Sequence, residues 1–206
     1  MNRKFLMTRR MAMMGAMASL TGCGAVTALN SAATPLDTYD LLPVPGAARG
    51  PRSSRTLAVA LPELPAAIAS DRIMIKPDAV SVTYLPDARW SDELPRVFQS
   101  LLVRSISGTG RLAYVGRSEG GPIANTVLLA RLDAFHLQVL ADDSIEARAD
   151  TTLTLLDDRT QRVRSSRSFS GTALAVDDTP RAAVASFQTI LNALLPEMAD
   201  WAATRA

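Results

Sequence analysis

The residues that most constrain the fold are IEARADTTLTLL at 145–156, where apolar and polar side chains alternate. The side chains expected on one face are Ile145, Ala147, Ala149, Thr151, Leu153 and Leu155. A period of two over this length indicates a half-buried strand of an antiparallel sheet. The next residues, DDRT at 157–160, have the composition of a turn, so we expect a partner strand that runs to about Ser170.

A second long strand is predicted over 126–140, but its apolar pattern slips. One face carries Leu128, Ala130, Leu132 and Ala134, after which the apolar residues are Phe135, Leu137 and Val139. One extra residue in a strand produces such a change of phase, so we expect a β-bulge near 134.

Five shorter segments also have the composition of strands and are bounded by turn-forming residues. They are 38–44, 57–61, 71–76, 80–85 and 111–116. Pro77 and Asp78 predict a turn between the third and the fourth of these segments.

From Ser91 the apolar period changes to that of a helix. The apolar stripe consists of Leu94, Val97, Phe98, Leu101, Leu102 and Ile106. Ser91 is the expected N-cap, and Gly108 and Gly110 are expected to end the helix.

Thr179 and Pro180 predict the beginning of a second helix. Its apolar stripe consists of Ala183, Phe187, Ile190, Leu191, Leu194, Met198 and Trp201. Pro196 is expected to kink this helix. Together the elements predict an α+β fold: a mostly antiparallel sheet with two main helices on one face, in a single domain over 38–206.

The first 22 residues have the pattern of an export signal. A basic segment at 2–10 precedes an apolar run of ten residues at 11–20, which is too short to span a bilayer as a helix. Leu20, Thr21 and Gly22 then lead into Cys23, the one cysteine of the chain. These four residues resemble the bacterial lipobox, although a chance cysteine behind an ordinary signal is the alternative.

The resemblance to a lipobox implies that the Cys23 thiol receives a diacylglycerol, that the leader is removed, and that the new amino group is acylated. We therefore expect a signal peptide over 1–22 and a lipidated N-terminus with a flexible tether over 23–37. In lipoprotein sorting, an Asp directly after the cysteine resembles an inner-membrane retention signal. This chain has Gly24 at that position, so we expect the periplasmic side of the outer membrane. Arg9 and Arg10 leave open whether export uses the general or the twin-arginine route.

The net positive charge of the chain comes from this leader. Residues 1–22 contain four of the 22 Lys and Arg and no acid, so the rest has 18 basic against 20 acidic residues. The remainder therefore has a formal charge of −2 and lacks the basic surface typical of nucleic-acid binding.

One motif suggests catalysis. GRSEG at 116–120 matches the nucleophile elbow G-x-S-x-G, which would make Ser118 a nucleophile. That elbow needs a helix directly after the serine, whereas the next residues predict a turn and a strand. The only histidine, His136, follows in that strand, and Asp133 is the only aspartate between it and Ser118. We therefore interpret the motif as a glycine-rich loop and expect no enzyme.

No cofactor or metal site is expected either. His136 alone cannot form a common metal site, and the Cys23 thiol belongs to the lipobox. The paired aspartates at 142–143, 157–158 and 177–178 follow predicted strands, where turn formation accounts for them.

Several segments together resemble one protein family. They are YDLLP (39–43), LAVALPELPAAIASDRIMIK (57–76), YLPDARWSDELPRVFQSLL (84–102) and the last helix with Trp201. This order is similar to that of the ABC-type transport auxiliary lipoprotein family, which includes the paraquat-inducible C lipoprotein. The resemblance implies an outer-membrane lipoprotein without catalytic residues. It also implies work beside an MCE-domain protein and an inner-membrane ABC transporter in lipid or solvent-related transport.

A protein of this kind works through its surfaces. Tyr84 and Trp90, near the predicted junction of strand and helix, are candidate interface residues, although a core position for Trp90 is the stronger interpretation. An exposed sheet edge would allow a homo-oligomer. The alternative function is that of a lipoprotein adaptor or regulator in cell-wall synthesis or envelope assembly.

Overall fold

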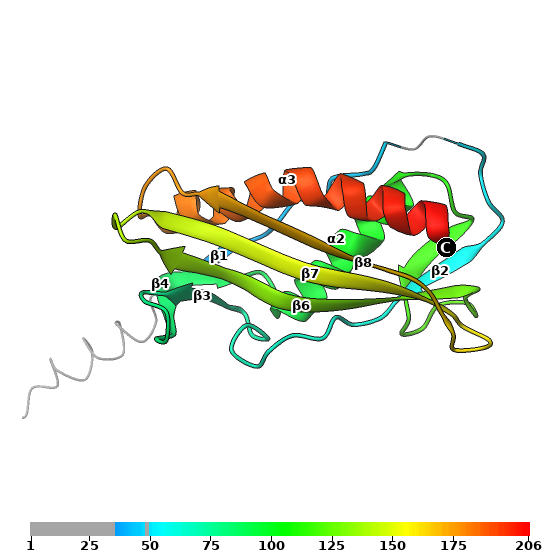
Figure 1. The fold of residues 1–206 in the computed structure, drawn as a ribbon, viewed down its shortest axis with the longest axis horizontal. Coiled ribbons are helices and arrows are strands. Elements are labelled where there is room, and N and C mark those ends of the chain that lie inside the picture. The colour runs from blue at the N-terminus through cyan, green and yellow to red at the C-terminus, as the bar shows by residue number, and fades with distance from the viewer. Residues whose placement is uncertain (1–35, 48–49) are drawn as a thin grey trace, which may run out of the picture. The chain divides into compact units, whose positions relative to one another are not determined.

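The computed structural model describes residues 36–47 and 50–206. In this part of the chain, eight strands form one mixed sheet, and helices α2 and α3 pack on one of its faces (Figure 1). The strands are β1 (Asp37–Tyr39), β2 (Thr56–Val59), β3 (Arg72–Lys76), β4 (Thr83–Trp90), β5 (Tyr114–Arg117), β6 (Thr126–Val139), β7 (Ile145–Asp157) and β8 (Val163–Leu174), and the helices are α2 (Leu94–Gly108) and α3 (Pro180–Arg205). The predicted α+β class and the two main helices are confirmed.

The three long strands β6, β7 and β8 form an antiparallel meander, as the alternation in 145–156 and the turn at 157–160 predict. In β6 the pairing with β7 shifts register between Leu132 and Ala134, which confirms the predicted bulge. Asp133 is the extra residue there. Because of it, Leu132 and Phe135 both point toward the helices and both are buried.

The prediction of a mostly antiparallel sheet is wrong, because most pairs of neighbouring strands are parallel. Four of the seven pairings are parallel: β1 with β4, β2 with β5, β2 with β6, and β3 with β6. β7 occupies one edge of β6, so β2 and β3 pair along its other edge, at opposite ends of the strand and parallel to it. β5 joins β2 in the same direction, and β1 joins β4. Only the meander and the β3–β4 hairpin are antiparallel.

The start of α2 also differs from its prediction. β4 continues to Trp90, beyond the predicted strand end at 85, and α2 begins at Leu94 with Glu93 as its N-cap. The Leu94 N–H donates to the Ser70 carbonyl at 3.1 Å, and the next residue is a proline without an N–H. The helix start therefore needs no capping hydroxyl, and Ser91 is not the cap.

The second helix begins as predicted, because the Thr179 hydroxyl accepts a hydrogen bond from the Ala182 N–H at 3.2 Å. α3 then continues without a break through Pro196 to Arg205. Neither helix of the described residues has the length and apolarity that crossing a membrane would require.

After β1 the chain becomes an extended strap, defined here as residues 40–47, which lies across both helices. The predicted strand 38–44 thus ends at Tyr39. The Leu42 backbone exchanges two hydrogen bonds with the Gln188 amide of α3, at 2.8 and 3.2 Å. The Val44 N–H donates to Ser105 Oγ of α2 at 3.2 Å, and the Ala47 N–H to Asp200 Oδ2 of α3 at 3.1 Å. Side chains of both helices therefore satisfy the backbone of a segment that belongs to no sheet.

Candidate functional site

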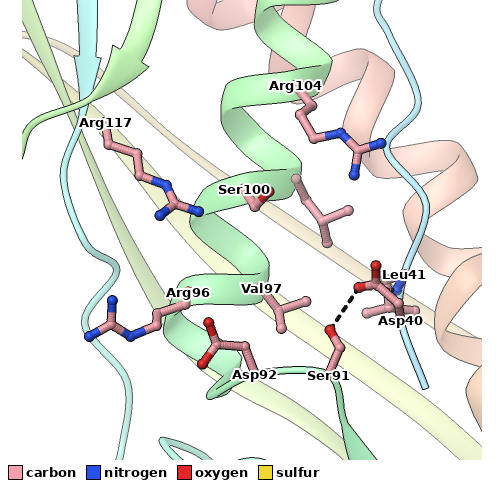
Figure 2. Close-up of a pocket in the computed structure, with 10 residues that line it drawn as sticks. Asp40, Leu41, Ser91, Asp92, Arg96, Val97, Ser100, Arg104 and Arg117 are labelled. Carbon is pink, nitrogen blue, oxygen red and sulfur yellow. Dashed lines mark hydrogen bonds between the residues drawn. The ribbon is translucent and has the colours of Figure 1, made fainter. Parts of the chain in front are cut away.

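A hollow of about 150 Å³ lies where the strap passes the N-terminal half of α2 and the end of β5 (Figure 2). Its charged side chains are Arg96, Arg104, Arg117, Asp40 and Asp92. Two hydroxyls, those of Ser91 and Ser100, also face the hollow, and the apolar lining consists of Leu41, Val97 and Leu101, all buried.

The helical repeat explains part of this arrangement. Arg96, Ser100 and Arg104 are spaced four residues apart, so they share one side of α2, away from its buried stripe. Arg117 is the last residue of β5 and extends toward Ser100, while Asp40 follows β1 at the beginning of the strap (Figure 2). Three separate stretches of the chain thus contribute to one hollow: the strap, residues 91–104 and the end of β5.

Local hydrogen bonds hold the two acids in position. Asp40 Oδ1 accepts from the Leu41 N–H at 2.9 Å and from the Ser91 hydroxyl at 3.1 Å. Asp92 Oδ1 accepts from the Glu93 N–H at 2.8 Å. Neither acid forms an ion pair with an arginine of the hollow among residues 36–47 and 50–206.

The arginines of the hollow also lack close ion-pair partners. Arg96 Nε lies 3.8 Å from Glu93 Oε2, a long contact between two exposed side chains that contributes little. Arg104 and Arg117 have no ion-pair partner among the residues that the structure describes. The hollow therefore carries charges of both signs that do not neutralise one another.

None of these arginines belongs to a motif that the sequence indicates. The spacing of Arg96, Ser100 and Arg104 on a predicted helix is the only local signal. Asp40 and Arg117 join them only through the fold.

The two candidate interface residues lie elsewhere. Trp90 is 2% exposed and makes edge-to-face contacts with Phe135 and Phe187 at centroid distances of 6.0 and 5.5 Å. Tyr84 is half-buried, and its hydroxyl donates to the Ala67 carbonyl at 3.1 Å. Trp90 is thus a core residue that joins sheet and helices, and any partner contact through Tyr84 remains a prediction.

The structure does not bring the residues of the possible hydrolase motif together. Ser118 follows β5, and its N–H donates to the Val59 carbonyl at 3.0 Å; the chain then turns into β6 without a helix. His136 lies near the opposite end of β6, where β3 pairs. It is 7% exposed, and burial, with Lys76 and Arg148 nearby, lowers the pKa of its imidazole. Among the described residues, no group of three or more His, Cys, Asp or Glu could hold a metal.

Cys23 and the lipobox residues Leu20, Thr21 and Gly22 lie outside the described residues, as does most of the expected tether. The expected lipidation at Cys23 therefore remains a prediction.

Comparison with known proteins identifies a family. The model of the family described as ABC-type transport auxiliary lipoprotein component matches residues 39–199. Among curated protein sequences, none matches the chain significantly.

Solved structures share the fold. A Xanthomonas campestris protein assigned to the family DUF330 is 23% identical, with a TM-score of 0.74 over 82% of this chain and 96% of that one. A second, described as an uncharacterized protein, is 16% identical with a TM-score of 0.59 over 82% of this chain and 97% of that one. A hypothetical protein from Chlamydia trachomatis is 11% identical, with a TM-score of 0.50 over 74% of this chain and 98% of that one. At these identities the similarity concerns the fold alone.

Proposed function

This chain belongs to the ABC-type transport auxiliary lipoprotein component family, and from that premise we propose a specific role. It is a non-catalytic lipoprotein of the outer membrane that assists an MCE and ABC-type system in lipid or solvent-related transport between the membranes. The observation that carries this proposal is the family match over 39–199, which spans nearly all of the compact unit 36–206.

The proposed location depends on the beginning of the chain. The lipobox ends at Cys23, thirteen residues before the compact unit, and these thirteen residues extend over at most about 45 Å. Lipidation of Cys23 would therefore keep the domain within that reach of the bilayer surface. Gly24 supports the outer membrane rather than the inner one.

The proposed partners are an MCE-domain protein and the inner-membrane ABC transporter. Homo-oligomer formation is also part of the proposal, and β8 is the edge that would support it. β8 has twelve residues and pairs only with β7 among the described strands, so its other edge presents free backbone groups.

The test is crosslinking in intact cells, followed by purification of the full-length lipidated protein and mass spectrometry. We expect an MCE-domain protein and ABC transporter subunits among the crosslinked proteins. The Cys23→Ser variant is the matched control, because it has the same domain without the anchor. Recovery of cell-wall synthases or envelope-assembly proteins without any transporter component would overturn the proposal in favour of the adaptor function.

A further inference from the structure

The hollow beside α2 presents unpaired charges of both signs on two of its sides. Arg104 and Arg117 flank the Ser100 hydroxyl on one side, and Asp40 and Asp92 lie on the other (Figure 2). Since these arginines and acids form no ion pairs with each other, their separation leaves space for a ligand between them.

The acids keep acceptor capacity toward such a ligand. In both Asp40 and Asp92, only Oδ1 accepts hydrogen bonds from the described residues. The second carboxylate oxygen of each remains available to a donor. An ammonium group is a suitable partner, because it donates three hydrogen bonds and carries the opposite charge.

The other side suits an oxyanion. A guanidinium group presents a planar fork of N–H donors that matches the oxygens of a phosphate, and the Ser100 hydroxyl adds one more donor. The apolar lining of Leu41, Val97 and Leu101 excludes water on one side, which strengthens electrostatic attraction within the hollow.

We propose that this hollow binds a group that carries a phosphate and a primary ammonium a few bonds apart, the chemistry of phosphoethanolamine. A simple anion would face repulsion from Asp40 and Asp92, and a simple cation would face repulsion from the three arginines. A ligand with both charges satisfies both sides. The hollow, of about 150 Å³, is of headgroup size, so the acyl chains of an intact lipid would remain outside it.

The source of the group is either a free phosphoethanolamine compound or the headgroup of a phospholipid. The site is defined by residues of the described domain, and it would bind this group whether or not the protein serves a transporter. Failure of its test is therefore distinct from failure of the proposed function.

The test is isothermal titration calorimetry at low salt with the full-length protein in an uncharged detergent. The probes are phosphoethanolamine, inorganic phosphate and ethanolamine. We expect phosphoethanolamine to bind about tenfold more tightly than either of the other two. Equal affinity for inorganic phosphate, or no binding of phosphoethanolamine, would overturn the proposal.

Variants separate the two sides of the site. Arg104→Gln and Arg117→Gln should each weaken phosphoethanolamine binding about tenfold, whereas Asp92→Asn should weaken phosphoethanolamine but not phosphate. Arg159→Gln, an exposed arginine of the β7–β8 turn, removes the same charge and should have no effect. A similar loss with Arg159→Gln would reveal nonspecific attraction and contradict the site.

Two further measurements complete the design. Thermal unfolding of each variant without ligand should match the unmodified protein, because all these side chains are exposed. At the same concentration, added phosphoethanolamine should raise the Tm of the Arg159→Gln variant more than that of Arg117→Gln. Vesicles of phosphatidylcholine with and without phosphatidylethanolamine identify the source. Preferential binding to vesicles that contain phosphatidylethanolamine indicates that the ligand is a lipid headgroup. Binding of soluble phosphoethanolamine alone indicates that the ligand is a free compound.

Discussion

The ring of Phe135 in β6 stacks on the ring of Phe187 in α3, with centroids 4.5 Å apart and an interplanar angle of 16°. The same Phe135 ring contacts Phe98 of α2 edge-on at 6.3 Å. One side chain of the sheet therefore joins both helices. The bulge at Asp133 makes this possible, since without the extra residue Phe135 would point to the opposite face.

Replacement of Phe187 tests how much this contact contributes. The side chain is fully buried, so Phe187→Ala should lower the free energy of unfolding by about 3–5 kcal/mol through lost burial and a cavity. Urea unfolding followed by circular dichroism measures the change. Ile123→Ala, at a residue 92% exposed, should change it by less than about 0.5 kcal/mol. A loss below about 1 kcal/mol at Phe187 would show that the ring is not a main link between helix and sheet.

A methyl group at Gly46 tests how closely the strap approaches α3. A Cβ there would clash with the Asp200 carboxylate and lie 3.1 Å from the Pro196 carbonyl oxygen. Gly46→Ala should therefore destabilise the protein by about 1–3 kcal/mol. In a double-mutant cycle with Asp200→Ala, the two effects should be less than additive, because the second change removes the nearest clash. Simple additivity would mean that the strap does not lie against Asp200 in solution.

Asp157 should make stability depend on acid pH. Hydrogen bonds from the Thr160 N–H at 3.0 Å and from Arg164 at 2.9 Å hold the pKa of its carboxyl at about 2. A depressed carboxyl pKa contributes stability above the ordinary value, near pH 4, and loses that contribution as the pH falls through about 2. Asp157→Asn should remove this part of the pH dependence in urea unfolding between pH 4 and 2. Asp158→Asn, in the same turn, is the matched control and should retain it.

Cys23→Ser tests the predicted lipidation. Without the thiol no diacylglycerol can be attached, so the precursor should remain uncleaved and fail to reach the outer membrane. Gel mobility, labelling with a fatty-acid analogue and membrane fractionation measure these steps. Gly22→Ala keeps a small residue before the cysteine and should mature normally. Normal maturation and localisation of Cys23→Ser would contradict the interpretation of Leu20–Cys23 as a lipobox.

Ser118→Ala tests the absence of hydrolase activity. Ser118 follows β5, which β2 separates from β6, and His136 lies near the end of β6 away from β2, so the alanine variant should retain any background hydrolysis of p-nitrophenyl esters seen with the unmodified protein. Loss of a measurable hydrolysis in this variant alone would restore the nucleophile interpretation of the GRSEG segment.

The sequence by itself determined the elements with a long local period. β6 with its bulge near 134, β7 and the bodies of both helices follow from side-chain alternation and helical spacing, since each pattern extends over ten or more neighbouring residues. β8 follows from the turn-forming residues at 157–160 that come after β7. The lipobox is equally local, and its consequences remain predictions.

Only the tertiary structure decided how the short strands pair and what the hollow contains. β2, β3 and β5 have four or five residues each, too few to specify partner or direction, and only the fold shows that β2 and β3 pair parallel to β6 and that β5 pairs parallel to β2. Ser91 is not the N-cap of α2, because the Ser70 carbonyl accepts the hydrogen bond from the first N–H of the helix. Asp40 and Arg117 are 77 residues apart in the chain, and only the packing of the strap and β5 on opposite sides of α2 places both charges around one hollow.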